Sequence, residues 1–172
     1  MKNKRHLYWI GGTFAALLGL TYLSKSVPNQ RAALSLAGHE LRTLDGARTV
    51  DLGQCRTPRC VTIYVAPWCG ICQRSTAFLN AVHKYLEARN IDTRIVVGRG
   101  NLENVKRYAP DFGPDALIDA EGKVPLQGGV PNFIVSTPTG EIIKTQAGVP
   151  GLYEPPFSES LMRQMSDFLG LS

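Results

Sequence analysis

The chain has 172 residues, enough for one domain of ordinary size and a short appendage. Hydrophobic residues make up 44% of the chain and charged residues 19%, which excludes a disordered or fibrous protein. The formal net charge of +5 and the four cysteines indicate a function only once their positions in the sequence are considered.

The positive charge is concentrated at the N-terminus. Lys2, Lys4 and Arg5 carry +3 of the net +5, which leaves +2 for the rest of the chain. This nearly neutral remainder has no basic patch interleaved with aromatic residues, so we expect no nucleic-acid partner. The basic end is followed by residues 7–23, which carry no charge.

Residues 7–23 are long enough to form a short membrane anchor. At about 1.5 Å per residue they span about 25 Å, near the lower limit for a bilayer core of about 30 Å. A cleaved signal peptide is one alternative, but Lys25 separates the small residues Ser24 and Ser26, and no Ala-x-Ala site is present. A buried core helix at the N-terminus is the other alternative. The positive-inside rule predicts a single pass through the inner (cytoplasmic) membrane, with residues 1–6 in the cytoplasm and the remainder in the periplasm.

The remainder of the chain predicts a linker and one α/β domain. Residues 24–38 are small and polar, as is typical of a linker, and the folded domain is expected over 39–172. In chain order we expect strands at 41–44 and 50–52 around an Asp45-Gly46 turn, a strand at 61–65, a helix at 72–89, a strand at 91–97, a helix at 102–108, strands at 116–118, 133–135 and 142–145, and a helix at 158–169. The strand, helix and strand over 61–97 predict a parallel βαβ unit.

Cys69 and Cys72 lie two residues apart at the expected switch from strand to helix. Backbone N–H groups and the helix dipole stabilise a thiolate at the first sulfur, and the second sulfur, one turn further on, can resolve a mixed disulfide. This pattern predicts redox chemistry with Cys69 as nucleophile and Cys72 as resolving cysteine. The alternatives are a zinc site, for which the other cysteines and the histidines lack ligand-like spacing, and a structural disulfide, which needs no helix N-terminus.

The segment 68–72 (WCGIC), which follows a hydrophobic strand, resembles the thioredoxin superfamily, as do 129–135 (GVPNFIV) and 140–142 (GEI). The resemblance covers roughly residues 39–170. The Asp45-Gly46 hairpin is similar to that of the membrane-anchored, extracytoplasmic branch typified by TlpA and ResA. This resemblance implies a thioredoxin-like fold, a central mixed sheet flanked by helices, with an N-terminal β-hairpin extension and one N-terminal transmembrane helix.

The resemblance also implies how a client is held beside the cysteines. It predicts a cis Val130–Pro131 bond that leaves backbone groups of Val130 open to an extended client segment, and it makes Trp68 a cover for the disulfide and a client contact. The alternatives are an ordinary trans proline and a tryptophan that serves only packing. No cofactor or metal is expected besides the redox-active Cys69–Cys72 disulfide.

Two features depart from the family pattern. The buried acid expected six residues before the nucleophile is replaced by Ile63, so proton transfer needs water or another group, for which Glu141 and Asp119 are candidates. Gly70 and Ile71, between the cysteines, supply neither a charge nor a side-chain donor, unlike the histidine of strongly oxidising relatives. This favours a reduction potential near that of thioredoxin, the reducing end of the range between thioredoxin and the oxidant DsbA. That range is about 150 mV, or about 7 kcal/mol for two electrons.

Cys55 and Cys60 form a second pair just before the 61–65 strand, with Pro58 between them. A structural disulfide is typical of two nearby cysteines in an oxidising compartment, and a second redox couple is the alternative. The strand from Cys60 to Ala66 spans about 20 Å. The two pairs are therefore expected at opposite ends of one strand, too far apart for direct exchange.

The whole sequence predicts a membrane-tethered periplasmic thiol–disulfide oxidoreductase. We expect it to act on disulfide-containing client proteins, more as a reductase, and to exchange electrons with a membrane donor or acceptor. A disulfide oxidase or isomerase is one alternative, and a metal-handling protein of the same fold, as in SCO-type copper assembly, is another. That metal-handling class uses Cys-x-x-x-Cys and a distant histidine, whereas no histidine follows His83 here.

Overall fold

The computed structural model of this chain describes residues 34–171. The predicted basic end, the anchor at 7–23 and most of the linker lie outside these residues. Among the residues described, no helix has the length and apolar character needed to cross a membrane.

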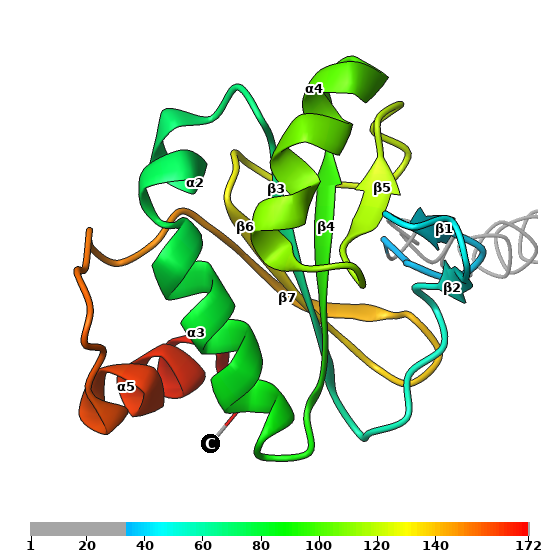
Figure 1. The fold of residues 1–172 in the computed structure, drawn as a ribbon. Coiled ribbons are helices and arrows are strands. Elements are labelled where there is room, and N and C mark those ends of the chain that lie inside the picture. Colours follow the sequence, from blue (N-terminus) through cyan, green and yellow to red (C-terminus); the bar gives the residue numbers. More distant parts are fainter. Residues whose placement is uncertain (1–33, 172) are drawn as a thin grey trace, which may run out of the picture. The chain divides into compact units, whose positions relative to one another are not determined.

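The described residues form strands and helices in the order expected for an α/β domain (Figure 1). These are β1 (Glu40–Thr43), β2 (Thr49–Asp51), β3 (Cys60–Val65), α2 (Gly70–Arg74), α3 (Thr76–Glu87), β4 (Asp92–Gly98), α4 (Leu102–Tyr108), the 3-10 turn η1 (Ala109–Phe112), β5 (Leu117–Asp119), β6 (Asn132–Ser136), β7 (Ile142–Ala147) and α5 (Glu159–Leu169). Each predicted strand and helix is present, with bounds shifted by no more than about two residues. Two differences are that the helix expected over 72–89 is two helices and that the 3-10 turn η1 was not expected.

The break between α2 and α3 lies at Ser75, whose φ of −98° and ψ of 6° depart from α-helical values. The N–H of Ser75 bonds both the Ile71 and the Cys72 carbonyl oxygens. The hydroxyl of Thr76 reaches back to the carbonyl oxygens of Cys72 and Gln73, at 3.1 and 3.0 Å. Such side-chain bonds compete with the regular backbone ladder, and hydrophobic periodicity does not reveal them.

The strands form one mixed sheet in the order β2-β1-β5-β4-β3-β6-β7. β3 and β4 are parallel, and β4 and β5 are parallel, which confirms the predicted βαβ unit. β6 runs antiparallel to β3, β7 runs antiparallel to β6, and β1 and β2 form the predicted antiparallel hairpin. The central position of β3 explains why every residue of this strand is buried.

Successive residues of β3 face two different apolar layers. Val61, Ile63 and Val65 belong to the larger cluster, which also holds the buried residues of α3, α4 and α5. Tyr64 belongs to a smaller cluster on the other face, whose members are Leu36, Leu41, Leu52, Tyr64, Val96, Leu117, Val124 and Ile134.

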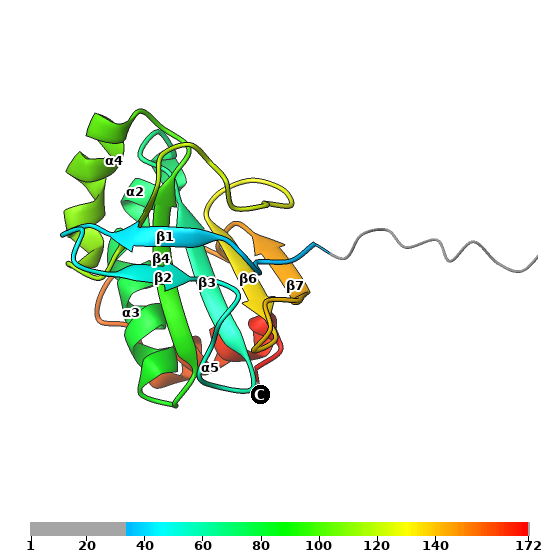
Figure 2. The same cartoon turned by 90° about the vertical axis from the view of Figure 1, so that its right-hand side faces the viewer.

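The helices α3, α4 and α5 of the described residues therefore lie on one face of the sheet. The connections from β3 through α3 to β4 and from β4 through α4 to β5 step in the same direction across the sheet. Right-handed crossovers in the same direction bring both helices to the same side. Figure 2 shows α3 and α4 on one side of the strands and the β1–β2 hairpin nearest the viewer.

Candidate active site

Cys69 is the N-cap residue of α2, the position at which the chain leaves β3 and turns into the helix. The backbone N–H of Cys72 points at the Sγ of Cys69, at a distance of 3.1 Å. This N–H is one of the donors that lack a partner within the helix, so it stabilises negative charge on that sulfur. The two Cα atoms lie 5.2 Å apart and the sulfurs form a disulfide.

The two cysteines differ in their access to solvent. Cys69 is 7% exposed, whereas Cys72 is fully buried in the apolar cluster beneath the helices. Thiol–disulfide exchange needs a sulfur that an incoming sulfur can reach. Of the pair, Cys69 is the residue that keeps some exposure to solvent.

Val130 and Pro131 lie beside Cys69 although they are about 60 residues away in the chain. The Val130–Pro131 bond is cis, as the resemblance implied. The Sγ of Cys69 lies 3.3 Å from the carbonyl oxygen of Val130. The antiparallel pairing of β6 with β3, in which Asn132 opposite Tyr64 is the last pair, brings these residues to the cysteine end of the sheet.

Trp68 is an exposed residue and does not serve as core packing. Its side chain is 64% exposed, and its indole N–H donates to the carbonyl oxygen of Arg99, just after β4. Ile71 is 42% exposed on the other side of Cys69 in the sequence. Two large apolar side chains thus lie at the surface next to the accessible cysteine.

Ile63, which replaces the buried acid of the family pattern, has apolar surroundings in the structure. Ile63 is fully buried and shares its cluster with Cys72. Glu141 precedes β7, whose first residue Ile142 pairs with Ser136, which in turn lies opposite Cys60. Glu141 is therefore at the wrong end of β3 to exchange protons with Cys72.

Asp119 is buried at the end of the sheet near Cys69, but its carboxylate makes its hydrogen bonds on the face opposite to the helices. It accepts hydrogen bonds from the Tyr64 hydroxyl and from the N–H groups of Lys123 and Val124. Since Tyr64 faces the smaller cluster, Asp119 is separated from Cys72 by the sheet. Neither acid suggested by the sequence is in contact with the cysteine pair.

A buried tyrosine near Cys72 was not found by sequence reasoning. The Tyr108 hydroxyl lies 3.0 Å from the Thr76 hydroxyl, which contacts the carbonyl oxygen of Cys72 at 3.1 Å. Burial raises the pKa of Tyr108, and the hydrogen bond with Thr76 offsets part of the rise. Tyr108 is the titratable side chain that the hydrogen bonds of the described residues connect to Cys72.

A pocket of about 610 Å³ lies between Trp68 and the helix α4. It is lined by Pro67, Trp68, Gln73, Gly100, Asn101, Asn104, Arg107, Tyr108 and Asp111. The residues from α4 have no motif that would single them out. They reach the site because α4 packs on the same face of the sheet as α2.

The second pair lies where the strand length predicted it. Cys60 is the first residue of β3 and Cys69 follows the last, so the two pairs are at opposite ends of the strand. Cys55 and Cys60 form a disulfide with Cα atoms 6.1 Å apart. Within residues 34–171, these cysteines and Asp92 are the one group of metal-ligand side chains close enough together to hold an ion. However, their sulfurs are joined and Asp92 is paired with arginines.

The comparisons with known proteins bear on the fold. No protein-family model and no curated protein matches the sequence. Among solved structures, the exposed lipoprotein thioredoxin Etrx1 of Streptococcus pneumoniae has a TM-score of 0.54 at 20% identity, over 75% of this chain and 97% of that one. The chain has a thioredoxin-like fold.

Two further structures agree with this thioredoxin-like assignment. MTB dsbF has a TM-score of 0.52 at 18% identity, over 74% of this chain and 92% of that one. A secreted Mycobacterium tuberculosis disulfide oxidoreductase homologous to Escherichia coli DsbE has a TM-score of 0.50 at 16% identity. The match covers 77% of this chain and 95% of that one. At these identities the likeness concerns the fold, and it confirms the thioredoxin-like fold that the sequence predicts. In this thioredoxin-like domain the β1–β2 hairpin precedes the central strand β3.

Proposed function

We propose that this chain is a membrane-tethered thiol–disulfide oxidoreductase that exchanges disulfides with client proteins through Cys69 and Cys72. The observation that carries the proposal is the position of Cys69, at the N-cap of α2 with the Cys72 N–H 3.1 Å from its sulfur. That N–H stabilises the thiolate, which is both the attacking form and the leaving form in exchange. The structural neighbours include a disulfide oxidoreductase, which supports the same chemistry.

In the reductive direction, the Cys69 thiolate attacks one sulfur of a client disulfide. The client disulfide breaks, its other sulfur leaves as a thiolate and takes a proton from solvent, and a mixed disulfide joins the client to Cys69. Cys72 then loses its proton and attacks the Cys69 sulfur, which releases the second client thiolate. The client gains two electrons and the Cys69–Cys72 disulfide is formed, to be reduced again by an electron donor.

The surface around Cys69 suits an extended client segment. The Val130 carbonyl oxygen, 3.3 Å from the Cys69 sulfur, is a backbone acceptor that a client N–H can approach. Trp68 and Ile71, both exposed, offer apolar contacts on the helix side. We assign Trp68, Val130 and Pro131 to client binding on this basis.

We propose reduction as the direction because the segment between the cysteines lacks groups that stabilise the reduced form. Gly70 has no side chain, and Ile71 carries no charge or donor. Strongly oxidising members of the superfamily owe their potential to extra stabilisation of the reduced thiolate. The neutral pair therefore favours a potential near that of thioredoxin, at about −270 mV.

The direction is tested by measuring the potential of the Cys69–Cys72 pair in the full-length protein in detergent. The protein is equilibrated in glutathione and in dithiothreitol redox buffers and quenched with acid. It is then alkylated, and the mass of the peptide that contains Cys69 and Cys72 is measured. A potential near about −120 mV, that of the oxidant DsbA, would replace the reductase by an oxidase or isomerase. Stoichiometric binding of copper or zinc by the reduced protein, without disulfide reductase activity, would favour the metal-handling class.

The membrane tether is a separate part of the proposal and rests on the charge pattern of the first 23 residues. We propose that the domain faces the periplasm and exchanges electrons with a membrane partner. Alkaline extraction of membranes tests the tether: the full chain should stay in the pellet, and a variant without residues 1–23 should not. Recovery of the full chain in the supernatant would contradict it.

A further inference from the structure

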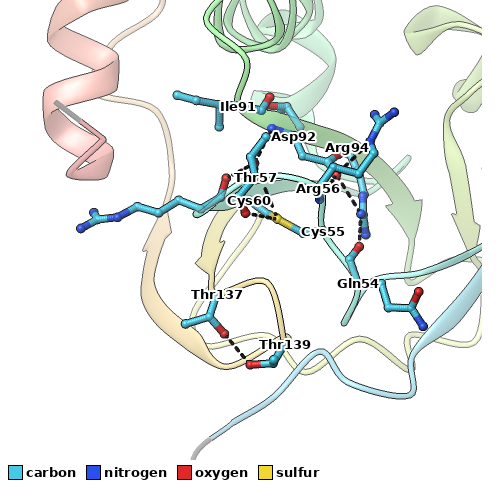
Figure 3. The surroundings of a disulfide bond; sticks show 12 residues. Gln54, Cys55, Arg56, Thr57, Cys60, Ile91, Asp92, Arg94, Thr137 and Thr139 are labelled. Atoms are coloured by element: carbon cyan, nitrogen blue, oxygen red, sulfur yellow. Dashed lines mark hydrogen bonds and ion pairs between the residues drawn. A yellow bond between two sulfur atoms is a disulfide. The ribbon is translucent and has the colours of Figure 1, made fainter.

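The two cysteines of the disulfide at the far end of β3 differ in their exposure to solvent. Cys55 lies in the loop before β3 and is partly exposed, whereas Cys60 is 2% exposed. Figure 3 shows Asp92, the first residue of β4, beside this pair. One carboxylate oxygen of Asp92 and both sulfurs lie within 4.8 Å of one another.

The loop that carries Cys55 is attached to the domain by bonds that do not involve sulfur. The N–H of Arg56 donates to the Asp92 carboxylate at 3.0 Å, and the N–H of Asp92 donates to the Thr57 hydroxyl at 3.1 Å. The Arg94 guanidinium donates to the backbone carbonyl oxygens of Asp51, at 3.0 Å, and of Gln54. The loop thus has attachments on both sides of Cys55 that do not depend on the disulfide.

The surface of this loop is positively charged. The side chain of Arg56 is 89% exposed, Arg59 is exposed, and the Arg94 guanidinium lies 3.2 Å from the carboxylate of Asp92. The loop region therefore has three arginines (Arg56, Arg59 and Arg94) and two carboxylates (Asp51 and Asp92), which leaves an excess of positive charge. Such a field attracts anions and stabilises a thiolate next to it.

From this geometry we propose that Cys55 and Cys60 form a second thiol–disulfide exchange site, which reacts with small anionic thiols of the glutathione class. The inference goes beyond the proposed function, because it concerns a different pair of sulfurs at the opposite end of β3. It gives each sulfur a role: Cys55 is attacked, and Cys60 is the leaving and resolving sulfur.

The exchange proceeds in two balanced steps. A glutathione thiolate attacks the Cys55 sulfur, the Cys55–Cys60 bond breaks, and the Cys60 sulfur leaves with the electron pair and takes a proton from solvent. A second glutathione thiolate attacks the glutathione sulfur of the mixed disulfide and releases Cys55 as a thiolate. One protein disulfide and two glutathione thiols thus become a protein dithiol and one glutathione disulfide.

Asp92 and the arginines act on the two sulfurs in different ways. In the dithiol form a thiol of Cys60 can donate to the Asp92 carboxylate, which keeps its proton in place. Cys55 lies closer to solvent, next in the chain to Arg56, so its thiolate is the nucleophile when glutathione disulfide reoxidises the pair. Asp92 is a positioning residue here, since it also binds the Arg56 and Arg94 side chains.

The first test uses the full-length Cys69→Ser, Cys72→Ser variant, in which Cys55 and Cys60 are the remaining cysteines. The variant is equilibrated with glutathione at graded ratios of thiol to disulfide, quenched and alkylated. Mass spectrometry then gives the fraction of protein in which the pair is reduced. The fraction of reduced pair should follow the ratio while the circular dichroism spectrum stays constant. A pair that is fully oxidised, or fully reduced, at every ratio overturns the proposal and leaves the Cys69–Cys72 assignment untouched.

The roles of the two sulfurs are tested in the same background by removing one cysteine at a time. With glutathione disulfide, the added Cys60→Ser change should yield one glutathione adduct on Cys55. The added Cys55→Ser change should leave Cys60 unmodified until the protein is denatured. Equal labelling of both variants, or labelling of Cys60 alone, contradicts the proposed order of attack.

The preference for an anionic thiol is tested by the rate of reduction. In the same background, Arg56→Gln with Arg59→Gln should slow reduction by glutathione several-fold and leave reduction by the cationic thiol cysteamine unchanged or faster. Arg163→Gln, which removes an exposed arginine on α5, is the matched control and should change neither rate. If both thiols slow equally, or the glutathione rate does not change, the anionic-thiol specificity is wrong.

Discussion

The hydroxyl of Tyr64 donates a hydrogen bond of 2.9 Å to the Oδ2 of Asp119. Both residues are buried, and the contact connects the middle of the sheet to the end of β5. Burial, and then the neighbouring carboxylate, raise the pKa of Tyr64 far above its usual range, so the phenol stays protonated and remains a donor.

The backbone of Asp119 extends this contact toward the active site. Its carbonyl oxygen accepts the N–H of Arg99, and the carbonyl oxygen of Arg99 accepts the indole N–H of Trp68. Arg99 has a φ of 52°, a left-handed conformation that is uncommon for a residue other than glycine. The buried pair thus supports the turn that orients the exposed tryptophan next to Cys69.

Removal of the Tyr64 hydroxyl should destabilise the domain. Tyr64→Phe leaves the Asp119 carboxylate without one of its three hydrogen-bond donors, and a lost buried bond to a charged group costs about 1.5–3 kcal/mol. Urea unfolding followed by circular dichroism measures this loss. Tyr85→Phe is the control, because the Tyr85 hydroxyl makes no hydrogen bond to the described residues, and it should leave the midpoint nearly unchanged. An equal loss in both variants would show that the hydrogen bond is not the cause.

Gly98 should tolerate no side chain. A Cβ at this position would overlap the Tyr64 hydroxyl and the backbone oxygen of Asp119. Overpacking of this kind costs about 1–3 kcal/mol, so Gly98→Ala should lower the free energy of unfolding by that amount or more. Gly129→Ala is the matched control, since a Cβ there meets no atom within 4 Å. Thermal unfolding of the two variants side by side distinguishes a steric effect at Gly98 from a general cost of losing a glycine.

The Asp92 carboxylate should make stability depend on acid pH. Burial opposes its ionisation, but the Arg56 N–H and the Arg94 guanidinium outweigh this and hold the pKa of Asp92 below its usual range. A group with a lowered pKa in the folded state adds stability above its unfolded pKa, near 3.8, and loses it as the pH falls through the folded value. Asp92→Asn should therefore be less stable than the parent at pH 7, and the difference should shrink below about pH 4. A difference that is constant from pH 7 to pH 2 would rule out this linkage.

The two cysteines of the proposed active site should behave differently when each is replaced. Cys72→Ser leaves an accessible Cys69 without its resolving partner, so a mixed disulfide with a client or a model disulfide should accumulate. Cys69→Ser leaves Cys72 as the one cysteine of this pair, and this buried sulfur should form little adduct under native conditions. Non-reducing electrophoresis, with peptide masses that separate adducts on Cys69 or Cys72 from those on Cys55 or Cys60, reports both results. Adducts on Cys72 in the folded protein would reverse the assigned roles.

The elements that could be predicted from the sequence are those whose signal is local. The β-branched run at 61–65, the switch of period after Cys69 and the Asp45-Gly46 turn each depend on neighbours within a few residues, and the structure contains all of them. The break at Ser75 was missed because it depends on side-chain hydrogen bonds that do not change the apolar stripe.

The motif around Cys69 and the positive N-terminal end were readable from sequence alone, because a helix start, a cysteine spacing and a run of apolar residues are defined along the chain. What only the tertiary structure decided is which distant groups meet the sulfurs. Val130 reaches Cys69 and Asp92 reaches the Cys55–Cys60 pair through the registers of β6 and β4 beside β3. Asp119 failed as a proton-transfer group for the same reason, since the alternation of side chains along β3 turns its partner Tyr64 away from Cys72.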